Sequence, residues 1–265
     1  MTKTELLDRY ARNSGERTLL ARVLDKRAAA EQRSVPAWTP FLSPEEQAAV
    51  AALLNAAGPT RYLFFGGYEG AERRLCAFLP DWQEEDDFLE DPEGPVTAIQ
   101  ADYAADASIT HRDILGGLMG LGITREKLGD ILIHPGYCQV LVLREVAPIL
   151  LSQWETAGRW RLRLKELSLD RLEVTPPEIK VIRDTVATLR LDAVTASGFS
   201  TSRAKAADFI SAGRVAVNHQ ECTKADKPMA QGDVITCRGL GKCVLREVLG
   251  QSKKGRLMIV LERYL

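Results

Sequence analysis

Residues 190–238 constrain the fold of this 265-residue chain more than any other stretch. Apolar residues recur there at helical spacing up to Gly198, and a second helical segment follows residues 200–202, whose hydroxyl groups are candidate helix caps. Gly213 ends that segment, and alternating apolar residues then predict short strands around a turn at residues 218–219. The pattern therefore predicts two short helices that lead into a compact set of β hairpins.

Charge is distributed unevenly along the chain. The formal net charge is −1, yet residues 180–265 hold 15 Lys and Arg against 8 Asp and Glu, a net charge of +7. Residues 1–179 hold 20 basic and 28 acidic residues, and eight of those acids lie between Asp81 and Glu93. Only the carboxyl-terminal part therefore has a net positive field of the kind that attracts a polyanion.

Two cations lie where helix stability alone does not favour them. Arg203 and Lys205 fall in the first turn of the second predicted helix, where positive side chains oppose the helix dipole. A phosphate docked there would gain from both cations and from the free backbone N–H groups. We therefore expect a phosphate-binding surface made by Ser202, Arg203, Lys205, Arg214, Lys224, Lys227, Arg238, Lys242, Lys253, Lys254 and Arg256.

Cysteine and histidine usage argues against several kinds of site. The five cysteines are an odd number without a C-x-x-C pair, which is typical of a reducing cytosol. The three histidines are scattered, so we expect no metal site and no cofactor. The amino terminus is charged and helical rather than a signal peptide, and no apolar run approaches the ~20 residues that a bilayer span requires. We expect a soluble, cytoplasmic monomer that does not bind membranes.

The region before this module begins with helices. Residues 1–58 carry apolar residues at helical spacing, and Ser43 followed by proline and two acids is a strong helix start. That helix should end at Gly58. A linker at residues 169–180, broken by two consecutive prolines, leads to the carboxyl-terminal module at residues 181–265.

Residues 59–168 form a second predicted domain. Two strands at residues 61–65 and 75–79 should pair around a glycine-rich turn, and the acidic run should form a solvated loop. The elements that follow are a strand at 96–100, a helix at 111–121, strands at 129–134 and 138–143, a helix at 145–156 and a strand at 159–167. This β-α-β-β-α-β order is the split βαβ pattern of ferredoxin-like (RRM-like) domains. We therefore predict an α+β fold with amino-terminal helices, a ferredoxin-like central domain and a carboxyl-terminal α/β module.

Several positions in the carboxyl-terminal module have a fixed spacing. They are Arg190-Leu191-Asp192, Gly198-Phe199, Ser202-Arg203, Ala206, Phe209-Ile210, Gly213, Val215, Val217-Asn218 and Gly232-Asp233. In these positions the module closely resembles the S4 RNA-binding domain. The resemblance implies structured RNA as the partner, bound mainly through shape and phosphate contacts.

Further motifs extend the resemblance over residues 10–265. They are Phe64-Phe65-Gly66-Gly67-Tyr68-Glu69-Gly70-Ala71-Glu72-Arg73, His111-Arg112-Asp113-Ile114-Leu115-Gly116, Leu121-Gly122-Ile123, Arg125-Glu126-Lys127 and Gly129-Asp130-Ile131. With them the chain resembles the YlmH-type S4-domain family. The resemblance implies a bacterial, non-catalytic protein that binds ribosomal RNA of the large ribosomal subunit and peptidyl-tRNA, in the rescue or quality control of stalled nascent chains. It also suggests a ribosome-facing surface made by Arg73, Arg74, His111 and Arg112.

The last predicted strand of the central domain offers a second RNA-facing surface. Period two places Arg159, Arg161, Arg163 and Lys165 on one face of residues 159–167. The alternative is an ordinary solvated sheet face. An RNA-recognition motif would also carry aromatic residues on its sheet for base stacking, and no such spacing is visible, so we do not expect this domain to read bases.

Enzyme motifs are weak. Arg190-Leu191-Asp192 is similar to the RLD motif of pseudouridine synthases, but it begins the S4-like module, so we expect Asp192 to cap or orient the first helix. A methyltransferase would need a glycine-rich turn between a strand and a helix for its cofactor, and none follows an apolar strand. An RNA-modifying enzyme with a site in residues 60–166 stays the alternative, and a protein-interaction adaptor that uses the acidic loop is a third hypothesis.

Overall fold

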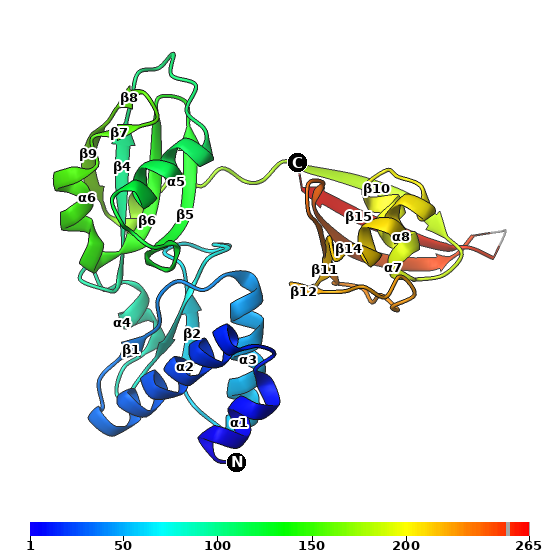
Figure 1. The fold of residues 1–265 in the computed structure, drawn as a ribbon, viewed down its shortest axis with the longest axis horizontal. Coiled ribbons are helices and arrows are strands. Elements are labelled where there is room, and N and C mark those ends of the chain that lie inside the picture. Colours follow the sequence, from blue (N-terminus) through cyan, green and yellow to red (C-terminus); the bar gives the residue numbers. More distant parts are fainter. Residues whose placement is uncertain (253–254, 265) are drawn as a thin grey trace. The chain divides into compact units, whose positions relative to one another are not determined.

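The computed structural model describes residues 1–252 and 255–264 (Figure 1). It is a mixed α+β protein that divides into two compact units, Met1–Thr175 and Pro176–Leu265. Among the described residues, none of the helices has the length and hydropathy needed to cross a bilayer.

The first unit begins with a helical layer and a small sheet. Its helices are α1 (Lys3–Tyr10), α2 (Ser14–Arg33) and α3 (Pro44–Ala57), and its strands are β1 (Ala37–Trp38), β2 (Tyr62–Phe65) and β3 (Leu75–Phe78), in the order β1-β3-β2. The predicted helix start is confirmed, because Ser43 and Glu46 form a reciprocal capping box. Gly58 ends α3 with a φ of 98°.

The β2–β3 hairpin packs with the amino-terminal helices. Cys76 and Phe78 of β3 share a buried cluster with Leu20 of α2 and Leu53 of α3. The sequence pattern predicts this hairpin in the central domain, on the other side of a boundary after residue 58. The structure differs because β3 also pairs with β1, and the resulting sheet needs the apolar sides of the helices to cover it.

The acidic run is not only a solvated loop. Residues Glu85–Leu89 form the short helix α4, and Phe88 in its middle is 3% exposed. Its ring lies 6.4 Å from that of Trp38 and 6.2 Å from that of Phe65, measured between centroids. The expectation of a simple loop was therefore incomplete, since one aromatic residue anchors the run while its eight acids stay exposed.

The rest of the first unit has the expected ferredoxin-like topology. Its main elements are β4 (Val96–Asp102), α5 (His111–Gly120), β5 (Leu128–His134), β6 (Tyr137–Leu143), α6 (Ala147–Gln153) and β9 (Arg163–Leu167), with short 3₁₀ turns η1 (Arg125–Lys127) and η2 (Arg144–Val146). The strands lie in the order β5-β6-β4-β9 and every neighbouring pair is antiparallel. This is the split βαβ arrangement that the element order predicted.

The strand predicted at residues 159–167 is in fact two strands. β8 (Trp160–Arg161) pairs with β7 (Thr156–Ala157) in a separate hairpin, and β9 begins only at Arg163. Gly158, with a φ of 58°, and Arg159 form the turn of that hairpin. Helix α6 ends earlier than predicted for the same reason, because the chain after residue 153 turns into β7.

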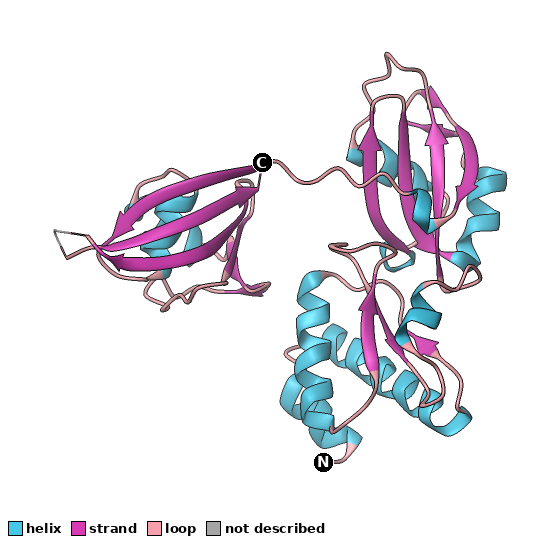
Figure 2. Cartoon of the chain, turned by 180° about the vertical axis from the view of Figure 1, so that it is seen from behind, coloured by secondary structure: helices cyan, strands magenta, loops and turns pink. Residues whose placement is uncertain are grey.

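The second unit has a six-stranded antiparallel sheet with two helices on one face (Figure 2). Its elements are β10 (Ile179–Val186), α7 (Leu191–Gly198), α8 (Arg203–Ser211), β11 (Val215–Val217), β12 (Gln220–Glu221), β13 (Val234–Cys237), β14 (Gly241–Gln251) and β15 (Leu257–Tyr264). The strand order is β10-β15-β14-β13-β11-β12. The two helices and the following hairpins agree with the predicted pattern. The segment before them is a strand and not a simple lead-in, and its first residues lie inside the expected linker.

Close packing between α7 and the sheet explains one of the glycines in this pattern. A Cβ at Gly198 would lie 2.7 Å from Sγ of Cys243 on β14. Cys243 is fully buried and Phe199 is 5% exposed. Gly198-Phe199 is therefore a packing motif that brings the end of α7 against β14.

Candidate nucleic-acid interface

An acidic side chain in the first turn of α7 fixes two arginines. The carboxylate of Asp192 accepts hydrogen bonds from Nη2 of Arg203 at 2.7 Å and from Nε and Nη2 of Arg190 at 3.3 and 3.4 Å. The Asp192 side chain is 9% exposed, whereas those of Arg190 and Arg203 are 42% and 56% exposed. We call these three residues the Asp192 cluster. One carboxylate thus orients two guanidinium groups that remain open to solvent.

The hydrogen bonds also set the charge state of Asp192. Burial alone would raise the pKa of Asp192, but the hydrogen bonds from Arg203 and Arg190 outweigh burial and hold that pKa below its usual value. Asp192 does not cap α7, whose N-cap residue is Arg190. It links α7 to the first turn of α8, which is an orienting role.

The start of α8 has the cap that the sequence predicted. Ser202 is the N-cap residue, and its Oγ accepts the backbone N–H of Lys205 at 3.2 Å. The backbone N–H groups of Arg203 and Ala204 belong to the first turn, which has no intrahelical acceptors for them. Both residues are exposed. Donor groups of the backbone and the Arg203 guanidinium therefore lie together at the surface, as phosphate binding requires.

A second group of cations packs around Phe209 of α8. Cζ of Arg214 lies 4.4 Å and Nζ of Lys205 lies 5.8 Å from the ring centroid. Nη2 of Arg214 also donates to the backbone carbonyl of Arg238 at 2.6 Å. The structure thus brings Lys205, Arg214 and Arg238 together from α8, the start of β11 and the β13–β14 turn.

The other predicted RNA contacts are less uniform. Lys224 is exposed, and the backbone carbonyl of Lys227 accepts the N–H of Leu191 at 2.9 Å, which places Lys227 beside the start of α7. Lys242 packs on Tyr264, with Nζ 4.2 Å from the ring centroid. Two predicted contacts lie outside the described residues, namely Lys253 and Lys254.

Arg256 joins Arg203 at a pocket that sequence reasoning missed. Nε of Arg256 donates to Oγ1 of Thr185 on β10 at 3.0 Å, across 71 positions of sequence. The pocket has a volume of about 240 Å³. Its polar lining consists of Asp184, Thr185, Ser197, Thr201, Arg203 and Arg256. No local pattern predicts this pocket, because it depends on the pairing of β10 with β15, which are distant in sequence.

Arg73 of the central region has a structural role. Its guanidinium donates to three backbone carbonyls at 2.9–3.2 Å, and its backbone N–H donates to Asp130 at 3.0 Å. Asp130 also accepts the hydroxyl of Tyr68 at 2.8 Å. These bonds fix the glycine-rich turn, which follows β2, against strand β5. The three carbonyls belong to Phe41, Arg125 and Leu128.

The first turn of α5 and the β7–β8 turn lie side by side. Thr110 caps α5 in a capping box with Asp113, and a Cβ at Gly158 would lie 3.5 Å from Oδ1 of that Asp113. The turn that contains Arg159 thus lies beside the first turn of α5, where Arg112 is exposed.

The other predicted cations of the central domain are dispersed. Burial lowers the pKa of His111, and the positive charge of Arg125 lowers it further. Nε of Arg74 is buried and has no hydrogen-bond partner among the described residues. Arg161 and Arg163 are exposed on β8 and β9. The seven residues of the expected second surface come from several elements of the first unit, and their contact with RNA stays a prediction.

The open face of the central sheet carries one aromatic pair, which the sequence analysis did not foresee. His134 and Tyr137 stack at the β5–β6 hairpin, with ring centroids 4.7 Å apart and planes at 19°. The chain after β9 crosses this face, as Figure 2 shows. There the backbone N–H of Glu173 donates to Oε1 of the buried Gln139 at 2.8 Å. Part of this sheet face is therefore occupied by the chain itself.

The sequence of this chain is similar to known families and proteins. Residues 95–171 match the family described as "Putative RNA-binding domain in YlmH", and residues 189–235 match the S4 domain. The chain is 32% identical over 251 residues to the "Ribosome-associated protein quality control protein P2" of Bacillus subtilis (strain 168). This alignment covers 94% of this chain and 95% of the relative. Among solved structures, the "Cell division protein ylmH from Streptococcus pneumoniae" has a TM-score of 0.49 and 22% identity, over 61% of this chain and 96% of that chain.

The helix pair, the hairpins and the matched residues define an S4-domain protein of the RNA-binding class. The similarity extends well beyond that domain. Because a relative with 32% identity is matched over almost its whole length, the chain belongs to the YlmH family. The resemblance seen in the sequence is confirmed.

Proposed function

We propose that this protein is a non-catalytic RNA-binding factor that associates with the large ribosomal subunit and with tRNA. We also propose that it acts in the rescue or quality control of stalled nascent chains. The Bacillus subtilis relative is named as a ribosome-associated quality control protein, which supports the ribosomal role. The match to the S4 domain supports RNA as the direct ligand.

The Asp192 cluster carries the RNA-binding part of the proposal. A guanidinium group matches the geometry of a phosphate with two parallel hydrogen bonds. Asp192 already holds the side chains of Arg190 and Arg203, so less side-chain entropy is lost when a phosphate binds. The net charge of +7 over residues 180–265 adds the long-range attraction.

The mode of recognition follows from the residue types. The candidate surface offers cations, backbone N–H groups and hydroxyls, which are the groups that contact phosphates. Folded RNA would be recognised by its shape and its phosphate positions, and affinity should decrease steeply with salt.

Charge reversal of Lys205, Lys224 and Arg238 tests this proposal. All three are exposed, so the change should leave the fold intact. Arg203 is kept, because a glutamate there would face the Asp192 carboxylate. The triple variant should lose co-sedimentation with large subunits, and the slope of log affinity against log salt should fall by about 2. Subunits with and without bound peptidyl-tRNA would separate the tRNA contribution.

The matched control reverses three cations of the other unit. Arg22, Lys26 and Arg33 on α2 are also exposed, and their reversal changes the net charge by the same amount. This control should sediment like the native protein. Unchanged sedimentation of the Lys205, Lys224 and Arg238 variant would refute the proposed surface. Equal losses of sedimentation in both variants would mean that the net charge, and not this surface, causes the binding.

A further inference from the structure

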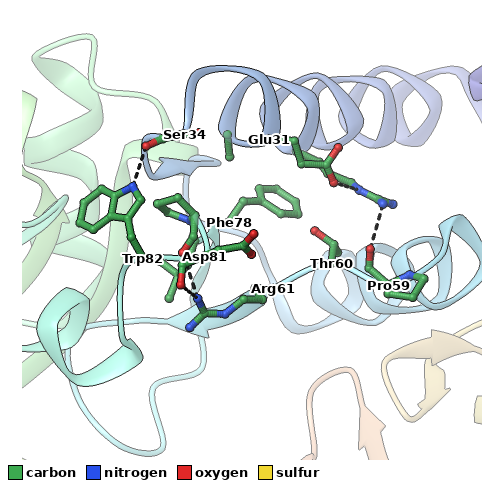
Figure 3. Close-up of a pocket in the computed structure, with 12 residues that line it drawn as sticks. Glu31, Ser34, Pro59, Thr60, Arg61, Phe78, Asp81 and Trp82 are labelled. Carbon is green, nitrogen blue, oxygen red and sulfur yellow. Dashed lines mark hydrogen bonds and ion pairs between the residues drawn. The ribbon is translucent and has the colours of Figure 1, made fainter.

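A pocket in the amino-terminal part has no role in the proposed RNA binding. It has a volume of about 580 Å³ and lies between the end of α2, the α3–β2 turn and the loop after β3 (Figure 3). Phe78, Leu79 and Pro80 give it an apolar floor, and Glu31 and Asp81 contribute carboxylates. The loop after β3 is also where the acidic run begins.

The indole of Trp82 lies at one end of this pocket. It is 65% exposed, which is unusual for the largest apolar side chain. Its Nε1 donates to the backbone carbonyl of Ser34 at 2.9 Å, as Figure 3 shows. The side chain is therefore held in place with a large part of its surface uncovered.

The loop that carries Trp82 is also fixed. The guanidinium of Arg61 donates to three backbone carbonyls of this loop at 2.9–3.0 Å. The second guanidinium of the pocket, that of Arg27, donates to Glu31 and to the carbonyls of Ala57 and Pro59. Three of the five N–H groups of each arginine are therefore directed at partners within the protein. The three carbonyls held by Arg61 belong to Pro80, Asp81 and Gln83.

The pocket adjoins a strongly acidic stretch of the chain. The two arginines of its lining are balanced by Glu31 and Asp81. The following residues up to Glu93 add seven more exposed carboxylates, of which only Glu84 pairs with one of these arginines, at 3.9 Å from Arg61. Outside this run residues 1–179 hold equal numbers of acidic and basic residues, so the run carries the whole excess of negative charge in this part of the chain. Such a surface repels nucleic acid and attracts a polycation.

We infer that this pocket binds a basic protein segment, with an arginine or lysine side chain against the Trp82 indole. Tryptophan is the aromatic residue that attracts a cation most strongly over its face. The aliphatic stem of the bound side chain would pack on Phe78 and Pro80, and its charged end would lie near Asp81. The acidic run would hold the other cations of the segment. This inference does not depend on the proposed RNA binding.

Binding of a short labelled peptide of alternating arginine and glycine to the full-length protein tests the inference. The peptide should bind the native protein, and binding should decrease with salt, whereas a peptide with glutamine in place of arginine should not bind. Trp82→Leu keeps an apolar side chain but removes the aromatic face, so it should weaken peptide binding about 5- to 30-fold. Trp82→Phe should retain part of the affinity.

Two controls make the outcome decisive. Ile149→Ala changes another exposed apolar residue of the same unit, one that does not line the pocket, and should leave peptide binding unchanged. Trp82→Leu should bind ribosomal RNA as the native protein does. Equal peptide affinity of Trp82→Leu and the native protein would overturn the inference. A loss of RNA binding in Trp82→Leu would also overturn it, since the surface would then belong to the RNA site.

Discussion

Replacement of Asp192 by asparagine separates pre-organisation from simple charge in RNA binding. The change removes one negative charge, so residues 180–265 would become more positive than their present +7. Charge alone therefore predicts tighter binding of RNA. The Asp192 cluster predicts the opposite, because Arg203 and Arg190 lose the carboxylate that orients them.

The magnitudes decide between the two effects. One added charge at about 7 Å from a phosphate in a water-like medium is worth about 0.6 kcal/mol, and salt reduces it further. Ordering a flexible side chain on binding costs about 0.5–1.5 kcal/mol, so two released arginines cost about 1–3 kcal/mol. We therefore expect Asp192→Asn to bind ribosomal RNA about tenfold more weakly.

Fluorescence anisotropy with a labelled ribosomal RNA fragment at fixed salt would measure this difference. Asp208→Asn is the matched control, since Asp208 is an exposed acid on α8 and the charge change is the same. The control should bind RNA slightly more tightly than the native protein. Equal or tighter binding by Asp192→Asn would refute the role of the cluster in pre-organisation.

The same variant should change stability in a pH-dependent way. Two charge-assisted interactions are lost, but both arginines are about half exposed, so we expect a loss of about 1 kcal/mol in the free energy of unfolding. The pKa of Asp192 is lowered in the folded state. Its contribution is thus complete at neutral pH and is lost only as the pH falls below about 4, through the folded-state pKa. Urea unfolding at pH 7 and in acid would reveal whether the difference between native and variant disappears in acid.

Two further predictions concern the fold. Gly67→Ala should lower the free energy of unfolding in urea by about 3 kcal/mol, because Gly67 has a φ of 94° and a Cβ there would lie 2.1 Å from Cδ2 of Leu141. Gly70 has a φ of 85° but open space around it, so Gly70→Ala should lower the free energy of unfolding by only about 1 kcal/mol. Equal losses in the two variants would contradict the packing explanation. Burial raises the pKa of three thiols to about 12. These thiols should therefore resist alkylation at pH 8 until the protein is unfolded. Rapid labelling of the native protein would show that they are not buried. These thiols belong to Cys76, Cys138 and Cys243.

Several features of the site could be predicted because their causes are local. The caps at Ser43, Thr110 and Ser202 each involve a backbone N–H only three residues further on. The β-α-β-β-α-β order also follows from short periodic segments, and the strand order agrees with it. Arg203 and Lys205 could be placed in the first turn of α8 for the same reason, and their contact with RNA stays a prediction.

Other features were decided by contacts between distant residues. Arg73 was expected at a ribosome-facing surface, and its three carbonyl acceptors come from other segments of the chain. The chain after β9 occupies part of the central sheet through the bond from Glu173 to Gln139, which lies 34 positions away. The position of the Trp82 indole likewise depends on its hydrogen bond to the backbone carbonyl of Ser34, 48 positions away.

The order of the elements, their helix caps and the accumulation of positive charge in the last third of the chain can all be read from the amino-acid sequence. Folding, in contrast, selects which cations are held in one orientation and which bind the backbone. The physical reason is that charge and periodicity are properties of single segments. The orientation of a guanidinium depends on an acceptor, such as Asp192 for Arg203, that only folding brings within 2.7 Å.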